Sequence, residues 1–287
     1  MIDKLKISVL VDDSKNPSKL ELQDKHGLSF YIEAEVKDEK ITILLDTGPS
    51  METIIYNVDR MEVDLSKIDL IFLSHGHYDH VNGLIGVLKR RSEPTIVIAH
   101  PQAFDSKFVY RPHLKYAGSF YQLSEIRAFG GILLFAKNHV KLSDGIMSSG
   151  EIQRSTTFEE VEGFWKVDDE RLTQDNMLDD QSLIVNLKGK GLVVIAGCAH
   201  AGIINTIKQA QRITGINRVH AVIGGFHLKD ASDKRIEATI EELLRLKLNI
   251  IAPCHCTGLK AVKRFTEVFH DRCRPLRVGT ILDLNGN

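Results

Sequence analysis

The side chains best suited to chemistry lie in one short segment. Residues Ser74–His80 read Ser-His-Gly-His-Tyr-Asp-His, which places three imidazoles and a carboxylate between positions 75 and 80. Imidazole and carboxylate groups are common ligands of zinc, iron and manganese. The preceding run, Ile68–Leu73, is apolar except for Asp69, which predicts a strand buried on both faces. Because ligand sites in α/β proteins lie at the carboxyl ends of strands, this segment predicts a metal site.

The spacing within the segment suggests that its ligands serve two ions. His75 and His77 can point to the same side of an extended turn, where they would bind one ion. Asp79 and His80 would point toward a second ion, and we predict that these two residues are catalytic. The alternative is a chance group of surface or core residues, which is disfavoured because four such residues seldom fall so close together.

This His-x-His-x-Asp-His pattern after a buried strand resembles the signature of the metallo-β-lactamase superfamily. Upstream, Leu44–Gly48 reads Leu-Leu-Asp-Thr-Gly and is similar to a second motif of that superfamily. The resemblance implies that Asp46 orients the metal ligands from behind or takes part in metal or substrate binding. Considered alone, Asp46 would be interpreted as a turn residue after a strand.

Two later histidines complete the ligand set that the resemblance implies. Ala196–Gly202 follows an apolar run and contains His200, which corresponds to the third histidine ligand of the first ion. Pro253–Gly258 follows another apolar run and contains His255, which corresponds to the last histidine on the second ion. Considered alone, either histidine would be a loop residue. The implied metal ligands are His75, His77, Asp79, His80, His200 and His255.

One position departs from the superfamily pattern. The superfamily usually places an aspartate that bridges both ions between the last two histidine motifs, and the corresponding stretch here is Ile223–Asp230. His227 or Asp230 is the candidate replacement, although an imidazole cannot bridge two ions as a carboxylate does. We interpret His227 as a metal ligand or a substrate contact and expect a weaker or differently coordinated second ion. A loop histidine outside the site is the alternative.

The cysteines near these motifs favour a structural interpretation. Cys254 and Cys256 flank His255, and on an extended strand their thiols would point to the face opposite its imidazole. We therefore expect both cysteines, and also Cys198, to be small buried residues rather than ligands.

Several strings narrow the resemblance to one branch of the superfamily. The motifs Gly-Cys-x-His-x-Gly, Gly-Gly-x-His-Leu and Pro-Cys-His-Cys-Thr-Gly, together with Ser149–Arg154 and Asp179–Leu183, are similar to a branch linked to archaeal methanopterin biosynthesis. Named members of this branch are ribofuranosylaminobenzene 5'-phosphate synthases, or synthases that join that product to a dihydropterin. Many other members are described only as metal-dependent hydrolases. The resemblance covers most of the chain.

The ligand set leads us to expect a metal-dependent hydrolase with one or two zinc ions, although manganese or iron suits the same ligands. Such ions lower the pKa of a bound water to about 7 and polarise the group under attack. The expected substrate is a phosphoester or related small molecule, with Arg154 as the predicted phosphate contact, because a guanidinium matches phosphate oxygens. Lys107, Arg111 and His113 are further cations of this kind, and ordinary surface positions are the alternative for each.

Three other functions stay open from the sequence. The branch resemblance implies a synthase, in which pyrophosphate leaves a phosphoribosyl or dihydropterin donor as an aromatic amine is joined to it. A di-iron redox protein would prefer carboxylates at the bridging position and a flavin domain, and the sequence shows neither. A metal-binding protein without catalysis would follow from the missing bridging aspartate.

Composition argues against several classes of protein. The 287 residues carry 37 Lys and Arg against 38 Asp and Glu, so no field of one sign indicates a nucleic-acid or membrane partner. No apolar run approaches the ~20 residues of a membrane helix. The first residues lack the apolar core of a signal peptide, and the four cysteines form no disulfide pattern. We expect a cytoplasmic protein that binds a small molecule, in an oligomeric state that the sequence leaves open.

Hydrophobic patterning predicts strands and helices interleaved in two similar halves. The resemblance implies a single domain, 1–287, with the α/β architecture of a four-layer αββα sandwich and the ions at one edge between two sheets. The aromatic-rich stretch at about 101–130 predicts an irregular insertion that could cap the site, and Glu159–Asp180 predicts a loop. The remaining predicted elements are strands at 5–11, 28–36, 41–45, 68–73, 95–99, 132–135, 146–149, 182–187, 192–196, 219–223, 249–252 and 276–278, and helices at 51–59, 82–91, 203–213, 232–246 and 259–269.

Overall fold

The computed structural model describes residues 1–37, 39–110 and 112–286. Among these residues, the largest sheet, here called sheet A, has the strand order β17-β1-β2-β3-β4-β5-β8. β1, β2 and β3 form an antiparallel meander, and β3, β4, β5 and β8 then run parallel. The strands of sheet A are β1 (Lys4–Val11), β2 (Ser29–Val36), β3 (Glu39–Leu45), β4 (Leu70–Phe72), β5 (Thr95–Ala99), β8 (Gly131–Phe135) and β17 (Ile281–Asn285).

A second sheet, sheet B, has the order β16-β15-β14-β13-β10-β9. The predicted strands at 182–187 and 192–196 form a hairpin, because β13 and β14 are antiparallel neighbours on either side of a short turn. β14, β15 and β16 run parallel, so their carboxyl ends lie at one edge. The strands of sheet B are β9 (Lys141–Ser143), β10 (Ile146–Ser148), β13 (Ser182–Leu187), β14 (Gly191–Ala196), β15 (Val219–Gly225) and β16 (Ile250–Cys254).

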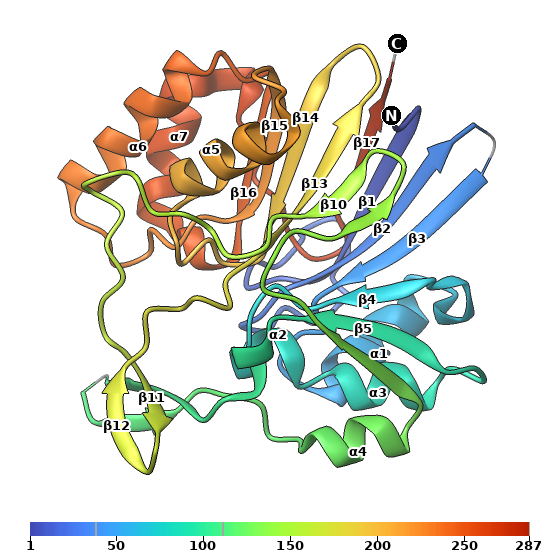
Figure 1. Ribbon diagram of the computed structural model, residues 1–287. Coiled ribbons are helices and arrows are strands. Elements are labelled where there is room, and N and C mark those ends of the chain that lie inside the picture. The colour runs from blue at the N-terminus through green and yellow to red at the C-terminus, as the bar shows by residue number, and fades with distance from the viewer. Residues whose placement is uncertain (38, 111, 287) are drawn as a thin grey trace.

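Sheets A and B pack face to face, and helices cover their outer faces (Figure 1). Each central strand serves two cores. In β14, Val193 and Ile195 pack between the sheets, whereas Leu192 and Val194 pack against the helices outside sheet B. Successive side chains of a strand point to opposite faces, which is why these strands are continuous apolar runs in the sequence. The predicted αββα sandwich is therefore confirmed.

The helices bury one face each and begin or end at recognisable residues. The Ser50 and Ser232 hydroxyls accept backbone N–H groups at the starts of α1 and α6, and Gly215, with φ of 70°, ends α5. The helices over sheet A are α1 (Met51–Arg60), α2 (Tyr78–Val81), α3 (Leu84–Lys89) and α4 (Leu123–Ala128), and those over sheet B are α5 (Ile203–Thr214), α6 (Asp233–Arg245) and α7 (Leu259–Phe269). Short 3₁₀ helices are η1 (Leu65–Lys67), η2 (Pro101–Phe104), η3 (His255–Thr257) and η4 (His270–Arg272).

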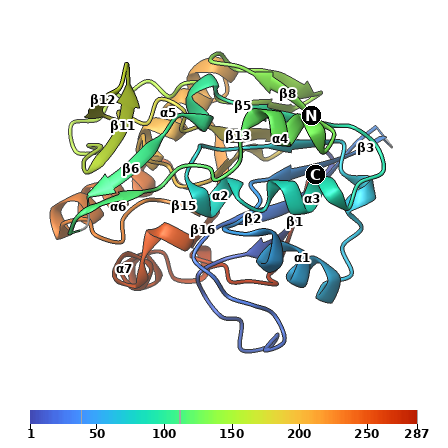
Figure 2. The same ribbon diagram turned by 90° about the horizontal axis from the view of Figure 1, so that it is seen from below.

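A small antiparallel sheet, here called the cap sheet, stands apart from the sandwich at one edge (Figures 1 and 2). Its order is β12-β11-β6-β7, from the strands β6 (Lys107–Tyr110), β7 (Leu114–Tyr116), β11 (Phe164–Asp168) and β12 (Arg171–Gln174). The prediction of a loop over Glu159–Asp180 is wrong here, because β11 and β12 form a hairpin. The predicted insertion at 101–130 supplies only β6 and β7. Its helix α4 returns to sheet A, where Ile126 is buried.

Two further expectations differ from the structure near element ends. The helix predicted at 82–91 is the shorter α3, and Leu276–Val278 is not a strand. The last strand is instead β17, which pairs with β1 and buries Leu282 and Leu284 while Ile281 faces outward. Edge strands of this kind show only a short alternation, which the prediction missed.

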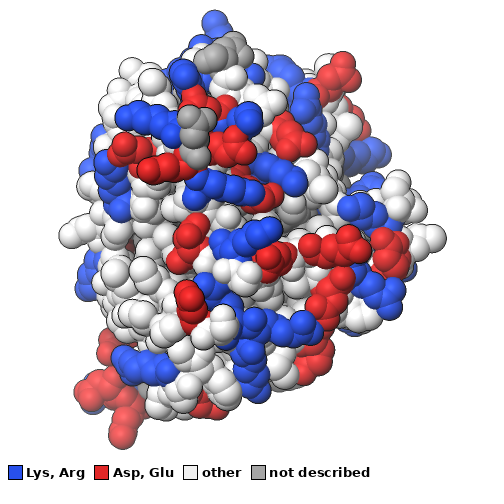
Figure 3. Space-filling view, turned by 90° about the vertical axis from the view of Figure 1, so that its right-hand side faces the viewer, with Lys and Arg blue, Asp and Glu red and all other residues white. Residues whose placement is uncertain are grey.

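The surface carries charges of both signs. Acidic and basic side chains are interspersed on the face that Figure 3 shows. In sheet A, Lys4 pairs with Glu35 at 2.8 Å and Lys6 with Glu33 at 3.4 Å. Among the described residues, no helix is both long and apolar enough to cross a bilayer.

Candidate metal centre

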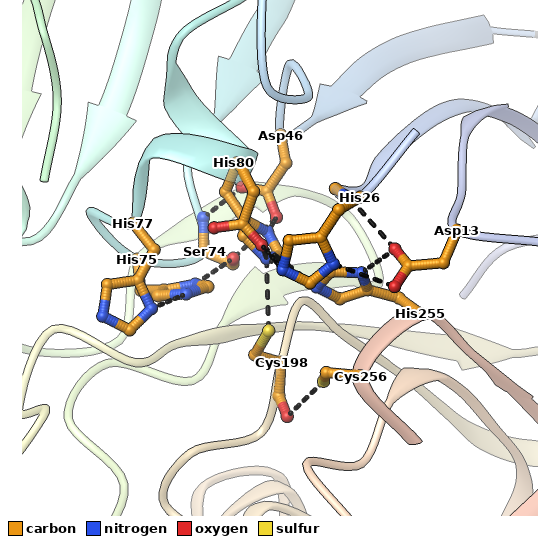
Figure 4. Close-up of polar contacts among 12 residues, drawn as sticks. Asp13, His26, Asp46, Ser74, His75, His77, His80, Cys198, His255 and Cys256 are labelled. Carbon is orange, nitrogen blue, oxygen red and sulfur yellow. Dashed lines mark hydrogen bonds and ion pairs between the residues drawn. The ribbon is translucent and has the colours of Figure 1, made fainter. Parts of the chain in front are cut away.

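The predicted histidines converge at the carboxyl edge of the sandwich. His75 and His77 lie between β4 and α2, His200 follows β14, His227 follows β15, and His255 follows β16. Parallel neighbours end at the same edge, so residues far apart in sequence meet here. Figure 4 shows several of these side chains pointing toward one another, together with residues that the sequence did not identify.

His75, His77 and His200, here called the first trio, have ring nitrogens that lie within 4.8 Å of one another. His75 Nε2 is 3.0 Å from His77 Nδ1 and 3.3 Å from His200 Nε2. The three rings are buried, and burial lowers the pKa of each, that of His77 to about 3. His77 Nε2 and His200 Nδ1 are buried without a hydrogen-bond partner among the described residues. A cation between neutral imidazoles would satisfy such a cluster.

Asp46 determines which nitrogen of two histidines is available to a metal. The Ser74 hydroxyl and His80 Nδ1 both donate to Asp46 Oδ2, at 2.6 Å each. Because the Ser74 hydroxyl proton is used there, His75 Nδ1, 3.0 Å away, donates to Ser74 Oγ. His75 and His80 therefore both present Nε2 lone pairs to the centre. Asp46 is fully buried and also accepts the Ser74 backbone N–H, so it acts from behind the ligands.

Asp79, His80 and His255, here called the second trio, face each other beside the first. His255 Nδ1 donates to Asp13 Oδ1 at 2.7 Å, so its Nε2 is also an acceptor. His80 Nε2 and His255 Nε2 are 3.2 Å apart, and Asp79 Oδ2 is 3.7 Å and 3.5 Å from them. Two lone pairs and a carboxylate at this distance require a proton or a cation between them. The arrangement therefore fits a second metal ion.

Asp13 and His26 belong to the centre and were missed from the sequence. Asp13 Oδ2 accepts His26 Nδ1 at 2.9 Å, and His26 Nε2 lies 3.3 Å from Asp79 Oδ2. The hydrogen bond that His26 donates to Asp13 raises the pKa of His26. The neighbouring Asp12 accepts the His255 backbone N–H at 2.9 Å, and burial raises the Asp12 pKa to about 6. A pair of aspartates directly after β1 was the available signal.

The cysteines correct the sequence interpretation. The side chain of Cys256 lies with those of His255 and Cys198, with the ligand atoms of the three within 4.8 Å. The expected opposite orientation of Cys256 fails because β16 ends at Cys254 and the chain turns into η3 at His255, which has φ of 48°. Cys198 Sγ is 3.1 Å from His80 Nε2. All three cysteines are buried, as expected, and Cys254 lies in the core between the sheets.

His227 lies on the cavity side of the first trio. Its ring centroid is 4.2 Å from that of His200, and its Nδ1 has no hydrogen-bond partner among the described residues. The backbone of His227 has φ of 46°, after Gly224 with φ of 121°. Asp230 follows at the cavity wall. His227 is thus placed where it could contact a metal ion or a substrate.

Buried acids hold the loops that carry these ligands. Asp179 accepts the Gly76 N–H at 2.8 Å, and Asp180 accepts the Ala201 N–H at 2.9 Å. Lys107 donates to Asp179 at 2.9 Å and to Asp175 at 2.7 Å, and its side chain is 1% exposed. Lys107 is therefore a structural cation beneath the ligand loop rather than a phosphate contact.

Other predicted cations lie away from the centre. Arg154 does not line the cavity described below, and its guanidinium donates to the carbonyls of Asn176 and Met177. Arg154 was predicted to contact phosphate because a guanidinium matches its oxygens, but the structure places it outside the cavity lining, with Nη2 directed at these two carbonyls. His113 is exposed and also outside the cavity lining. Arg111 lies outside the described residues.

A cavity of about 830 Å³ opens over the metal centre, between the sandwich and the cap sheet. Its floor includes His77, Asp79, His200, His227 and His255. Its walls include aromatic side chains and cations from the cap sheet, from α2 and α6, and from the loops after β7 and β15, namely Tyr78, Tyr116, Phe120, Phe164, Lys115, Lys229 and Arg235. The cavity is large enough for a drug-sized ligand.

Comparisons with known proteins agree with this geometry. Residues 23–208 match the metallo-β-lactamase superfamily. The chain is 36% identical, over 98% of its length and 97% of the relative's, to 7,8-dihydropterin-6-methyl-4-(β-D-ribofuranosyl)-aminobenzene-5'-phosphate synthase of Methanocaldococcus jannaschii. It is 32% identical to an uncharacterized protein of the same organism, over 91% and 94% of the two chains.

Solved structures show the same fold. Tm1679, described as a metal-dependent hydrolase of the β-lactamase superfamily, superposes with a TM-score of 0.80 and 27% identity over 98% of this chain and 99% of that one. A diphosphatase of the PhnP family superposes with a TM-score of 0.53 at 12% identity, over 99% and 98% of the two chains, which shows the fold alone. That fold implies divalent metal binding, and the chain belongs to the metallo-β-lactamase superfamily.

Proposed function

We propose that this protein is a metal-dependent synthase that joins a dihydropterin-6-methyl donor to the amine of 4-(β-D-ribofuranosyl)aminobenzene 5'-phosphate. The supporting relative carries this product in its name and is 36% identical over almost the full chain. This reverses the order of the sequence-based expectations, in which phosphoester hydrolysis came first. The observation that carries the proposal is a cavity that combines a metal-ligand floor with an aromatic wall.

The aromatic wall suits a substrate with flat rings. Tyr78 and Phe120 are stacked with centroids 6.3 Å apart and planes at 14°, and Phe120 stacks on Tyr116 at 6.0 Å and 23°. Phe120 is 65% exposed and Tyr116 is 43% exposed. Offset stacking on such rings stabilises planar ligands. A dihydropterin or an aminobenzene ring could extend this stack.

Cations at the same cavity suit the phosphate groups of both substrates. Lys115 from the cap sheet, Lys229 after β15 and Arg235 from α6 all line it. Arg235 uses Nη1 for the Glu160 carbonyl, while its Nε is buried without a partner. A guanidinium binds phosphate oxygens through paired N–H groups. These residues replace Arg154 as the proposed phosphate contacts.

In the proposed reaction, the amine nitrogen forms a bond to the methylene carbon of the dihydropterin donor. The bond from that carbon to the diphosphate oxygen breaks, diphosphate leaves with the electron pair, and the amine releases a proton to solvent. Divalent ions held by the two trios would stabilise negative charge on the leaving diphosphate. His26, whose pKa is raised by its hydrogen bond to Asp13, could donate a hydrogen bond to the same group. The aromatic wall would hold the two rings in reach of each other.

The test supplies purified, zinc-loaded protein with dihydropterin-6-methyl diphosphate and the aminobenzene ribofuranoside 5'-phosphate. We expect the coupled product by mass spectrometry, with one diphosphate released per product. His77→Ala, which removes a ligand of the first trio, is the inactive control. Diphosphate release at the same rate without the amine would instead support the hydrolase function. No reaction in either assay would overturn the proposal.

A further inference from the structure

The thiol of Cys198 lies at the junction of the two trios. Within the described part of the chain, the Cys198 sulfur groups within 4.8 Å with ligand atoms of His75 and His80, of His200 and His227, and of His255 and Cys256. Zinc–ligand distances are 2.0–2.3 Å, so ligand atoms of one ion lie only a few ångströms apart, and the Cys198 sulfur is 3.1 Å from His80 Nε2. The sulfur is therefore within coordination reach of both halves of the centre.

The surrounding backbone holds this sulfur in place. A Cβ at Gly197 would lie 2.0 Å from Ser74 Oγ, so the chain passes directly against the ligand loop only because residue 197 is glycine. The Gly225 N–H donates to the Gly197 carbonyl at 3.0 Å. A Cβ at Gly225 would lie 2.6 Å from Cys256 Sγ. The glycines thus create the space in which the two thiols approach the metal centre.

Neighbouring groups leave the Cys198 sulfur free to act as a ligand. Cys256 Sγ donates to the Cys198 backbone carbonyl at 3.5 Å, which occupies the Cys256 proton. The Cys198 side chain is 3% exposed, and its sulfur is 3.1 Å from the Nε2 lone pair of His80. His200, two residues along, is buried, and its Nδ1 has no partner among the residues that the structure describes. These buried acceptors surround a point where a cation is needed.

We infer that Cys198 Sγ is a metal ligand shared by the two trios and occupies the place of the bridging carboxylate that the sequence lacks. The inference depends on the metal dependence of the proposed function but not on which reaction the protein catalyses. Thiolates select zinc or iron over manganese and magnesium, because soft sulfur ligands bind the harder ions poorly. The centre should therefore hold zinc or iron in preference to manganese.

Cobalt substitution tests the inference without a substrate. Metal-depleted full-length protein is loaded with two equivalents of Co²⁺, and its near-ultraviolet absorption is recorded. A thiolate ligand produces a sulfur-to-cobalt charge-transfer band. We expect this band in the unaltered protein and in Cys273→Ala, whose sulfur lies in the core 3.7 Å from Thr266 Oγ1. We expect it to disappear in Cys198→Ala.

Two further variants keep the test decisive. Cys198→Asp should lose the band but still bind two ions by elemental mass spectrometry, because a carboxylate can bridge them, whereas Cys198→Ala should retain one. Cys256→Ser should keep the band.

A band that persists in Cys198→Ala and Cys198→Asp, or is absent from the fully loaded unaltered protein, would overturn the inference. If Cys198→Ala fails to fold, Cys198→Asp alone decides the origin of the band. A normal band without synthase activity would leave the inference intact and reject only the proposed reaction.

Discussion

The two trios are neighbours, yet their surroundings differ. The first trio consists of imidazoles alone, buried under the cap sheet and next to Phe164, whose ring is 4.7 Å from that of His200. The second trio contains Asp79 and is supported from behind by Asp46 and Asp13. Histidine ligands are present on both sides of the centre, but the negative charge of the carboxylates is concentrated on the side of the second trio.

This difference sets the protonation of the two sides before metal binds. Burial lowers the pKa of all the first-trio histidines, so they are neutral at physiological pH. Burial opposes charging His255 as well, but its hydrogen bond to Asp13 and the nearby carboxylates of Asp13 and Asp79 outweigh it and raise the His255 pKa to about 10. The first trio is ready for a cation, whereas the second holds a proton that a cation must displace.

The largest expected effect comes from removing a first-trio ligand. His77→Ala should lose one of two ions and reduce turnover below detection, because three nitrogens define that site and a buried vacancy cannot be filled by another side chain. Elemental mass spectrometry and the synthase assay measure the two effects. His113→Ala, at an exposed position, is the matched control and should change neither. Two ions per chain in His77→Ala would contradict the assignment of the first trio.

Replacing the carboxylates that support the ligands should change the affinities of the two ions to different extents. Of the two trios, Asp13 contacts only the second. Asp13→Asn should therefore weaken binding of the second ion by about 10- to 100-fold, since partners behind a ligand fix its orientation and basicity. Asp46→Asn should weaken both ions, because Asp46 bonds to His80 and to the Ser74 hydroxyl that orients His75. Zinc titration against a chelator measures both affinities. Equal effects of the two variants on both ions would show that the trios are not separable.

The two ions should respond differently to pH. His255 is protonated in the metal-free protein below its pKa of about 10, so the second ion releases a proton on binding. Its affinity should rise about tenfold per pH unit between about pH 6 and pH 8. The first-trio histidines should add little pH dependence in this range, because His77, with a pKa of about 3, is already neutral, so any slope for the first ion comes from the shared Cys198 thiol. Chelator titrations at several pH values measure how the affinity of each ion changes with pH. Equal changes for both ions would contradict the difference in protonation between the two trios.

The smallest expected effect concerns the aromatic wall, which lies outside both trios. Phe120→Ala should leave both ions bound and raise KM for the ring substrates about threefold to tenfold, because a lost stacking contact is worth about 0.5–1.5 kcal/mol. Phe120→Tyr should restore KM to near its original value. Steady-state kinetics on the synthase reaction measure the change. An unchanged KM in Phe120→Ala would place the ring substrates elsewhere in the cavity.

Local pattern explains which parts of the molecule could be predicted. The apolar runs of the central strands and the His-rich segment are patterns of residues that are adjacent in the sequence. The sequence alone therefore predicted these strands and the position of the histidines at strand ends. Asp13 and His26 lie far from the other ligands in sequence and enter the centre only because the segment after β1 folds against His255 and Asp79. β11 and β12 are short strands that form a hairpin, and β11 pairs with β6, a partner distant in the chain. Pairings of this kind leave little trace in a local pattern.

The sequence by itself determined the sandwich, its parallel strands and the histidines at their ends, because buried strands need apolar runs and metal sites need imidazoles. Only the tertiary structure decided which groups share the centre. It turned Cys256 toward the site at η3, held Cys198 between two close-packed loops, and drew Lys107 into an ion pair beneath Gly76. The physical reason is that side-chain direction at a loop depends on backbone angles and on contacts across the fold, neither of which residue spacing specifies.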